Sequence, residues 1–467
     1  MISDEAFLTA TLRSLAQGPS VARILAAGVQ AVEPGEAVRR CLRREGAHLS
    51  VAGRDYDLAG FRRVFVLGIG KASAAMAEAV QAAIGAEMEG GVVITKHLPQ
   101  KGKQKTKKAK IKTKNVSSNG PGRVEFVEGG HPLPDERSLR AGERTVALAA
   151  SLRPDDLLLC LISGGGSALV TAPVAGVSLP DLQALTAALL ACGARVDEIN
   201  TLRRHLDRVK GGGVAKLAGG ATIVSLILSD VVGNPLEAIA SGPTAPDPTT
   251  REQALAILEH YALNDKVPAS ILAALESEGE TPKPGDGLFG RVQNVLVGSN
   301  LLAAQAALRQ AQEEGFHPYL LRTDQQGEAR QVAFELATFL RQARLSGTPV
   351  PAPACIVVGG ETTVTLGPNP GRGGRNTELA LAAVTELADF PGALLAALAS
   401  DGEDGPTDAA GAVVSGETFR RALALGLQPV EALARNDSYP FFAALDDLLK
   451  PGPTGTNVGD LTFLLNF

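Results

Sequence analysis

The first segment with the residue types for chemistry is a glycine turn that follows an apolar run. In VFVLGIGKASAAM (64–76), Gly68 and Gly70 precede Lys71, where an alanine-rich helical pattern begins. Glycine lets a backbone approach a ligand closely, and the N-terminus of a helix offers unpaired N–H groups to an anion. Lys71 adds a mobile positive charge at the same place. The turn predicts a phosphate- or carboxylate-binding site, although a plain strand-to-helix turn explains the glycines equally well.

A second glycine turn, in LLLCLISGGGSALV (157–170), also joins an apolar run to a helical pattern. Consecutive glycines cost backbone entropy on folding, so a close approach to a ligand explains three of them better than a bare turn does. The flanking hydroxyls add donors for phosphate or carboxylate oxygens. The predicted binding turn consists of Ser163, Gly164, Gly165, Gly166 and Ser167.

Carboxylates follow two further apolar runs, in TIVSLILSD (222–230) and SDGEDGPTDAAGA (400–412). Open α/β sheets bind ligands outside the carboxyl ends of their strands, where acids can hold Mg²⁺ or accept a substrate proton. A helix cap or a turn is the ordinary alternative for each of them. The segment 400–412 also fails the EF-hand pattern, because Ala412 replaces the terminal glutamate. The candidate metal ligands are Asp230, Asp401, Asp404 and Asp408.

A glycine-rich loop with two arginines leads into a helical pattern in GRGGRNTELAL (371–381). Guanidinium groups on such a loop suit bidentate binding of phosphate or stabilisation of charge during its transfer. Both Arg372 and Arg375 are candidates. The polar residues that we expect at the ligand are Asn376 and Glu378 after the loop, and Asn457 before the last strand. His131 and His205 are more readily explained as hydrogen-bonded structural histidines than as ligands.

The elements that must position these residues alternate along the chain. Apolar runs with strand character are separated by Ala/Leu-rich helical patterns, which indicates βαβ units and a mainly parallel sheet. Glycine and proline breaks at 241–250 and 281–290 mark a change of domain. We predict an N-terminal doubly wound domain over residues 1–265, whose opening helices cover its sheet. A smaller α/β domain with a mixed sheet follows over 285–467.

Composition narrows the class of protein. The 467 residues are 45% hydrophobic and 20% charged with a net charge of −5, as in a globular protein without a nucleic-acid partner. The lysine-rich segment 96–115 lacks aromatic residues and is best explained as a solvated loop insertion. Four scattered cysteines, no secretory signal and no long apolar stretch predict a cytoplasmic protein without a membrane span.

In order along the chain, these segments resemble the MOFRL family of glycerate 2-kinases. The resemblance runs nearly end to end, which makes it far more specific than any one motif. It is carried by GIGKAS, EGGHPLPDERS, SGGGSAL, NTLRRHLDRVKGG, LSDVVGNPLEAIASGPTAPDPTT, GRGGRNTELAL, SDGEDGPTDAAGA and PTGTNVGDL.

This resemblance implies transfer of phosphate from ATP to the 2-hydroxyl of D-glycerate with Mg²⁺, giving 2-phosphoglycerate. It implies an active site in the cleft between two domains, with Lys71 and, rather than Arg372, Arg375 as the catalytic pair. The segment 96–115 departs from the compact connection of the family. Phosphoryl transfer requires mostly positioning and charge neutralisation, which glycine loops, Lys, Arg and Mg²⁺ provide. The oligomeric state, including a homodimer, stays open.

Two other functions compete with this interpretation. The turn at Gly68 and Gly70 nearly matches the dinucleotide fingerprint, so an NAD(P)H-dependent hydroxypyruvate reductase is the main alternative. However, Ser73 replaces the third small residue of the fingerprint, and the next strand ends in Lys96 instead of an acid. A non-catalytic sugar-phosphate-binding protein is the third candidate, but it leaves the Lys, Arg and acidic residues unexplained.

Overall fold

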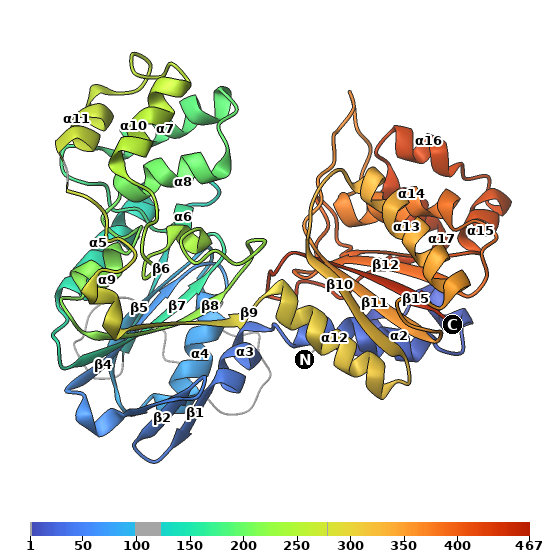
Figure 1. Ribbon diagram of the computed structural model, residues 1–467, viewed down its shortest axis with the longest axis horizontal. Helices are drawn as coiled ribbons and strands as arrows, with labels where there is room; N and C mark the ends of the chain where they lie inside the picture. Colours follow the sequence, from blue (N-terminus) through green and yellow to red (C-terminus); the bar gives the residue numbers. More distant parts are fainter. Residues whose placement is uncertain (1, 99–122, 278) are drawn as a thin grey trace. The chain divides into compact units, whose positions relative to one another are not determined.

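The computed structural model describes residues 2–98, 123–277 and 279–467 (Figure 1). Contacts between Cα atoms divide the chain into two compact units. We call residues 38–228 and 234–297 the parallel-sheet unit. The mixed-sheet unit consists of the residues up to 37, the short segment 229–233 and residues 298–467.

The parallel-sheet unit is built on a sheet with the strand order β6-β5-β4-β7-β8-β9. The four pairings from β6 to β8 are parallel. In chain order the strands lie 3-2-1-4-5-6, which is the doubly wound order of dinucleotide-binding folds. The strands are β4 (Arg63–Ile69), β5 (Met88–Thr95), β6 (Arg123–Glu128), β7 (Asp156–Ser163), β8 (Thr222–Leu228) and β9 (Val292–Gly298).

Among the described connections, helices join β4 to β5, β6 to β7, β7 to β8 and β8 to β9, as the βαβ pattern predicts. α4 packs against β4, β5 and β7, and α5 packs against β5 and β6. A small antiparallel sheet precedes them, with β1 (Leu42–Glu45), β2 (His48–Val51) and β3 (Arg54–Asp57). The helices are α4 (Ser73–Ile84), α5 (Glu136–Ala150), α6 (Gly166–Leu169), α7 (Leu179–Ala191), α8 (Val196–His205), α9 (Gly213–Leu217), α10 (Arg251–His260) and α11 (Ala269–Ser277), with 3₁₀ turns η2 (Leu58–Gly60), η3 (Ile239–Ser241) and η4 (Gly287–Arg291).

The mixed-sheet unit has the strand order β10-β11-β15-β12-β13-β14. Only β10 and β11 pair in parallel among the described strands of this sheet; the other neighbours are antiparallel. The strands are β10 (His317–Gln325), β11 (Ala354–Gly360), β12 (Ala393–Ala399), β13 (Gly411–Ser415), β14 (Leu448–Leu449) and β15 (Asp460–Asn466). The helices that accompany them are α12 (Asn300–Glu313), α13 (Ala329–Ser346), α14 (Arg375–Glu386), α15 (Thr418–Ala424), α16 (Pro429–Ala434) and α17 (Ser438–Leu445).

The cores follow from the apolar periodicity of the sequence. β7 is buried along its whole length, as its unbroken apolar run requires of a central parallel strand. In α13 the buried positions recur three and four residues apart, which turns one face of the helix toward the core. These positions are Ala329, Val332, Ala333, Leu336, Ala337, Leu340 and Ala343. Small aliphatic side chains thus replace the scarce aromatic residues.

The predicted α/β class, with a mainly parallel sheet first and a mixed sheet second, is confirmed. The two units differ from the predicted domains 1–265 and 285–467 in three places: residues 1–37, the segment 229–233 and residues 285–297. The N-terminal helices η1 (Asp4–Phe7), α1 (Ala10–Ser14) and α2 (Gly18–Gln30) belong to the mixed-sheet unit, where α2 packs on α12. The sequence predicted these helices as part of the first domain instead. α3 (Pro34–Cys41) spans the change of unit. β9, by contrast, borders the first sheet.

Two other predictions concern the surroundings of the fold. Among the described residues, no helix is long and apolar enough to cross a membrane. The lysine-rich segment 96–115 lies outside the described residues apart from its first three positions.

Candidate functional site

The two glycine turns meet where the strand order of the parallel sheet reverses. β4 and β7 are neighbours, and each is followed by one of the turns. The Lys71 amide donates to the Gly164 carbonyl at 3.0 Å, and the Ala72 amide donates to Ser163 Oγ at 3.0 Å. Open α/β sheets bind ligands at this reversal point, outside the carboxyl ends of the strands. The sheet therefore places the two glycine turns side by side, at the edge where such sheets bind ligands.

Glycine is required in the first turn because the second turn lies against it. Gly70 has a φ of +132°, and a Cβ at this position would lie 2.2 Å from Ser163 Oγ. At Gly68 a Cβ would lie 3.0 Å from the methyl groups of Val93, on the neighbouring strand. Gly70 therefore excludes a side chain, and at Gly68 a side chain would require Val93 to shift, so both glycines serve close packing whether or not a ligand binds.

Lys71 lies in the turn itself, since α4 begins two residues later. A Cβ on Gly165 would meet Lys71 Cε at 3.0 Å and His131 Cδ2 at 3.3 Å, so both side chains lie over this glycine. Lys71 is exposed. Within the described part of the chain, its ammonium has no hydrogen-bond or ion-pair partner. A positive charge is thus available directly beside the second glycine turn, residues 163–167, which we call the SGGGS turn.

The electrostatics beside the turn favour an anion. Burial lowers the pKa of His131, and the charges of Lys71 and Lys96 lower it further. The imidazole therefore stays neutral at pH 7, while the two ammonium groups keep the region positive. His131 thus adjoins the site, although the sequence favoured a structural role.

A third loop, after β8, closes on the SGGGS turn from another direction. A Cβ on Gly166 would lie 2.6 Å from the Ala240 methyl group, and Ser167 Oγ lies 2.8 Å from Ser241 Oγ. Ala240 and Ser241 have φ values of +51° and +60°, which are rare for residues with a side chain. Such strain clusters at ligand sites. Ser241 is not among the residues predicted from the sequence, where the signal for it is the polar SGP turn (241–243) after an apolar stretch.

In the mixed-sheet unit, Arg375 is held by two carboxylates at the start of α14. Its Nε and Nη2 donate to Asp460 at 2.5 and 3.0 Å, and its Nη1 donates to Glu361 at 2.6 Å. Burial raises the pKa of Asp460 to about 6, although the Arg375 guanidinium opposes the shift. The described residues accept three of the five N–H groups of Arg375, which leaves two for a ligand.

Arg372, the alternative to Arg375, has a different environment. Its guanidinium stacks over the ring of Tyr439, 4.1 Å from the centroid, on the exposed part of the loop. The two arginines of the loop therefore differ in their partners. Arg375 is held by two carboxylates, whereas Arg372 stacks on Tyr439 at the surface.

Asp404 caps α14. Its oxygens accept the backbone N–H groups of Asn376 and Thr377 at 3.0 and 2.8 Å, together with their side-chain donors. Only 1% of the residue is exposed, and burial raises its pKa. A carboxylate at a helix N-terminus satisfies unpaired N–H groups and favours the helix dipole. This is the structural alternative that the sequence left open for an aspartate at such a place.

The other predicted polar residues each have a different environment in the mixed-sheet unit. Asn376 is buried between Asp404 and the cavity that Asp460 and Glu361 line. Glu378 is 1% exposed, forms an ion pair with Arg330 and accepts a hydrogen bond from Asn436 at 2.9 Å. Its side chain is thus occupied within the unit. Asn457 accepts the Gly459 N–H at 3.0 Å, which fixes the turn before β15.

The four candidate metal ligands do not form a cluster. Within the ranges that the structure describes, no group of three or more His, Cys, Asp or Glu side chains is arranged to hold a metal ion. Asp408 is bonded to Tyr439 and Lys450 at the surface, and Asp401 accepts the Glu403 N–H at 3.1 Å. Asp230 follows β8, as predicted.

The comparisons with known proteins agree with this fold. The model of the MOFRL family matches residues 354–460, and a domain of unknown function, DUF4147, matches residues 20–276. A glycerate kinase from Thermotoga maritima has a solved structure that superimposes with a TM-score of 0.82 at 36% identity, covering 95% of this chain and 98% of that one. The fold and the matches together define an α/β protein of the kinase type found in that family.

Relatives of known sequence cover nearly the whole chain. The glycerate 2-kinase of Pyrococcus horikoshii is 38% identical over 95% of this chain and 96% of its own length. A protein of Agrobacterium vitis, named a putative hydroxypyruvate reductase, is 42% identical over 86% of this chain and 87% of its own. The chain belongs to the MOFRL family of glycerate 2-kinases.

Proposed function

We propose that this protein is a glycerate 2-kinase that transfers the γ-phosphoryl group of ATP to the 2-hydroxyl of D-glycerate. The 2-hydroxyl oxygen forms a bond to the γ-phosphorus, the bond from that phosphorus to the ADP oxygen breaks, and the hydroxyl proton is released. The observation that carries the proposal is the side chain of Lys71, which lies over Gly165 at the reversal point of the parallel sheet. A cation and a glycine turn at this position suit a phosphoryl group.

Lys71 and Arg375 have separate roles in this proposal. Lys71 brings a point charge on a flexible stem, which can follow the phosphoryl group as it moves from donor to acceptor. Arg375 is fixed by Asp460 and Glu361 and presents its two remaining N–H groups in one plane. Fixed donors stabilise developing charge without reorganisation, which is the main catalytic contribution in phosphoryl transfer.

Mg²⁺ is the proposed metal ion, and it supplies charge neutralisation at the phosphates when bound. The described acids do not build a complete protein cage, but a Mg²⁺ ion that arrives with ATP needs only one or two carboxylates. We retain Asp230 and Asp401, because each follows the carboxyl end of a strand. Asp404 and Asp408 are assigned to the helix cap and to Tyr439 and Lys450 instead.

The unpaired state of all four cysteines supports a reducing compartment, so we also propose a cytoplasmic location. A homodimer stays a prediction that the mass in solution tests.

The decisive experiment incubates purified protein with D-glycerate, ATP and Mg²⁺ and resolves 2- from 3-phosphoglycerate. We expect 2-phosphoglycerate from the natural sequence and a loss of about 10²- to 10³-fold in kcat for Lys71→Ala, as for the removal of one charge-stabilising donor. Lys216→Ala, on α9, is the control for loss of a lysine elsewhere in the same unit.

The reductase alternative is tested in parallel with NADH and hydroxypyruvate. Oxidation of NADH without release of ADP in the kinase assay would replace the kinase proposal by the reductase. Binding of glycerate without turnover in either assay would indicate a binding protein.

A further inference from the structure

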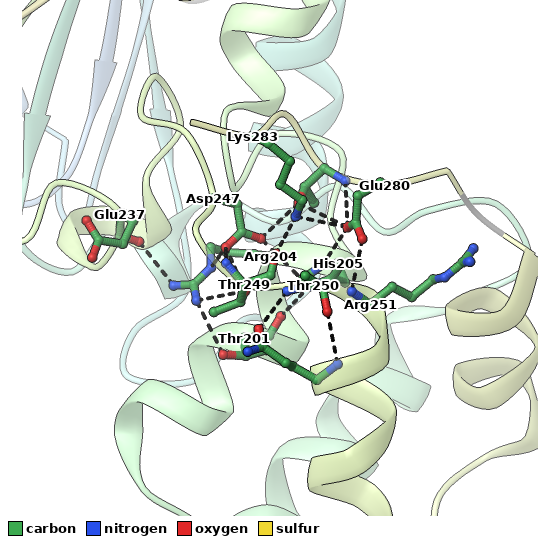
Figure 2. A network of polar contacts seen from close by, with 12 residues as sticks. Thr201, Arg204, His205, Glu237, Asp247, Thr249, Thr250, Arg251, Glu280 and Lys283 are labelled. Atoms are coloured by element: carbon green, nitrogen blue, oxygen red, sulfur yellow. Dashed lines mark hydrogen bonds and ion pairs between the residues drawn. The ribbon is translucent and has the colours of Figure 1, made fainter. Parts of the chain in front are cut away.

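Two consecutive arginines on α8 have opposite environments. Arg204 is 4% exposed, and its Nε lies 2.8 Å from Asp247 Oδ1, which is fully buried. Its Nη atoms donate to the Glu237 carbonyl and to the Thr201 and Thr249 hydroxyls. Figure 2 shows this network around Asp247. The charge of Arg204 is therefore neutralised inside the protein.

Arg203 has no such partner. Its one hydrogen bond, from Nη1 to Asn200 Oδ1, is long at 3.5 Å, and no carboxylate pairs with it in the part of the chain that the structure describes. The guanidinium is largely buried, and burial lowers its pKa without any neighbouring acid to oppose the shift. A buried cation without a counter-ion costs free energy that nothing in the described protein offsets. Such a group calls for an anion from outside.

Arg203 lines a small, partly enclosed pocket of the parallel-sheet unit. Its lining combines polar residues, among them Ser167 and Lys210, with apolar residues such as Leu185 and Leu189. Concave sites with an apolar wall and a few converging polar groups are typical of small-molecule binding.

The other charges of the pocket cancel. Lys210 forms an ion pair with Asp207 and donates to the Val170 carbonyl at 2.9 Å. Asp207 also accepts the Thr171 hydroxyl at 2.8 Å and two backbone N–H groups, at 3.1 and 3.0 Å. Among the described residues, no hydrogen bond or ion pair joins this carboxylate to Arg203. The net charge of the lining is therefore one positive charge, which belongs to Arg203.

The pocket adjoins the proposed reaction site through the SGGGS turn. Ser167 lines the pocket, and two residues earlier Gly165 contacts Lys71. The pocket lining and the glycine that Lys71 contacts are thus two positions apart in one turn. The pocket and Lys71 belong to the same unit, so this relationship depends on that unit alone.

We propose that Arg203 binds the carboxylate of the acceptor, a small 2-hydroxy acid, and selects against neutral polyols. The inference rests on the proposed kinase function and adds the residue that recognises the acceptor. Guanidinium and carboxylate groups match as bidentate pairs, and a buried charge left without its partner rejects an uncharged analogue strongly. The leucine wall limits the acceptor to a short carbon chain.

The test compares Arg203→Met with Arg204→Met, a change of the same type one residue away. Binding is measured without ATP, as the shift of the thermal unfolding midpoint by D-glycerate and by glycerol, its nearest neutral analogue. We expect D-glycerate to raise the midpoint of the natural sequence, glycerol not to, and Arg203→Met to abolish the shift. Without ligand, Arg203→Met keeps or raises the midpoint because it removes an uncompensated buried charge, whereas Arg204→Met lowers it.

Kinetics separate this inference from the kinase function. In Arg203→Met we expect KM for D-glycerate to rise about 10- to 100-fold, the range expected for a lost charge-assisted hydrogen bond, with KM for ATP unchanged. Arg203→Lys keeps the charge and recovers part of the affinity. Arg208→Met, at an exposed position of the same segment, keeps the natural KM.

The outcomes are distinct. A natural enzyme that is active, with an unchanged KM for D-glycerate in Arg203→Met, would overturn the role of Arg203 and leave the kinase intact. If, without ligand, Arg203→Met lowers the thermal unfolding midpoint as much as Arg204→Met does, then Arg203 has a structural role instead. An inactive natural enzyme would refute the kinase proposal first.

Discussion

Arg375 and Asp460 form a bidentate pair, with Nε to Oδ2 at 2.5 Å and Nη2 to Oδ1 at 3.0 Å. The pair joins the first residue of α14 to the first residue of β15, two elements that are distant in the sequence. Because the fork of the guanidinium matches both carboxylate oxygens, Asp460 fixes the plane in which Arg375 presents its remaining donors. Asp460 is therefore a positioning residue for Arg375.

Asp460→Asn should reduce kcat about 10- to 100-fold, since it removes the charge-assisted bonds that orient Arg375. The natural enzyme should also lose activity as the pH falls through about 6, where Asp460 gains a proton. The Asp460→Asn side chain cannot gain this proton, so the pH dependence of kcat in the variant should lack the decrease near pH 6. Measurement of kcat from pH 5 to pH 8 checks both expectations. If kcat of Asp460→Asn decreases over the same pH range, the decrease belongs to another titrating group.

Gly70→Ala should destabilise the parallel-sheet unit by more than about 3 kcal/mol, because the new Cβ would lie 2.2 Å from Ser163 Oγ at a φ of +132°. The control is Gly53→Ala, which has a similarly unfavourable φ of +82° but open space around it. Its cost should be about 1–2 kcal/mol, from the backbone conformation alone. Chemical denaturation measures both. Equal losses would show that the contact between the turns is not tight.

Asp404→Ala should lower stability by about 1–3 kcal/mol, because it leaves buried N–H groups of α14 without an acceptor. The Mg²⁺ concentration for half-maximal activity should stay the same. Asp408→Ala removes an exposed carboxylate from the same loop and should change stability by about 0.5 kcal/mol or less. A higher Mg²⁺ requirement in a stable Asp404→Ala enzyme would return Asp404 to the metal site.

Glu280, in the polar network of Figure 2, should make the stability of the protein depend on pH in the acid range. Partial burial works to raise the pKa of Glu280, but bonds from the Arg251 and Thr281 N–H groups and from Lys283 hold it at about 2. The ordinary value is 4.5, so the stability that Glu280 contributes is present above pH 4.5 and is lost as the pH falls toward 2.

Glu280→Gln should therefore lower the unfolding midpoint at pH 7 and differ progressively less from the natural protein below pH 4.5. Scanning calorimetry between pH 7 and pH 2.5 measures the difference, with the exposed Glu259→Gln on α10 as control. A constant difference at all pH values would contradict the ionic role of Glu280 and indicate a steric one.

The residue pattern alone determined the class of fold and the position of the binding turns. A buried parallel strand needs an unbroken apolar run, and a close approach between turns needs glycine, so both constraints are local in the sequence. That is why β4, β7 and the turns after them agree with the prediction. The alternation of strands and helices also predicted βαβ units correctly.

The tertiary structure alone decided which elements share a sheet and which side chains meet. The apolar face of α2 can cover either sheet equally well, because burial of apolar area has no direction. The pairing of β12 with β15 joins residues that are far apart in the chain, and no local pattern encodes it.

The same limit applies to charged residues, whose partners come from distant loops. The sequence shows Arg203 and Arg204 as two identical neighbours on one helix. Their side chains point in different directions around α8, so one meets Asp247 and the other lines a pocket. From the sequence, Asp404 can likewise be a metal ligand or a helix cap. Only its hydrogen bonds to the first N–H groups of α14 distinguish these two roles.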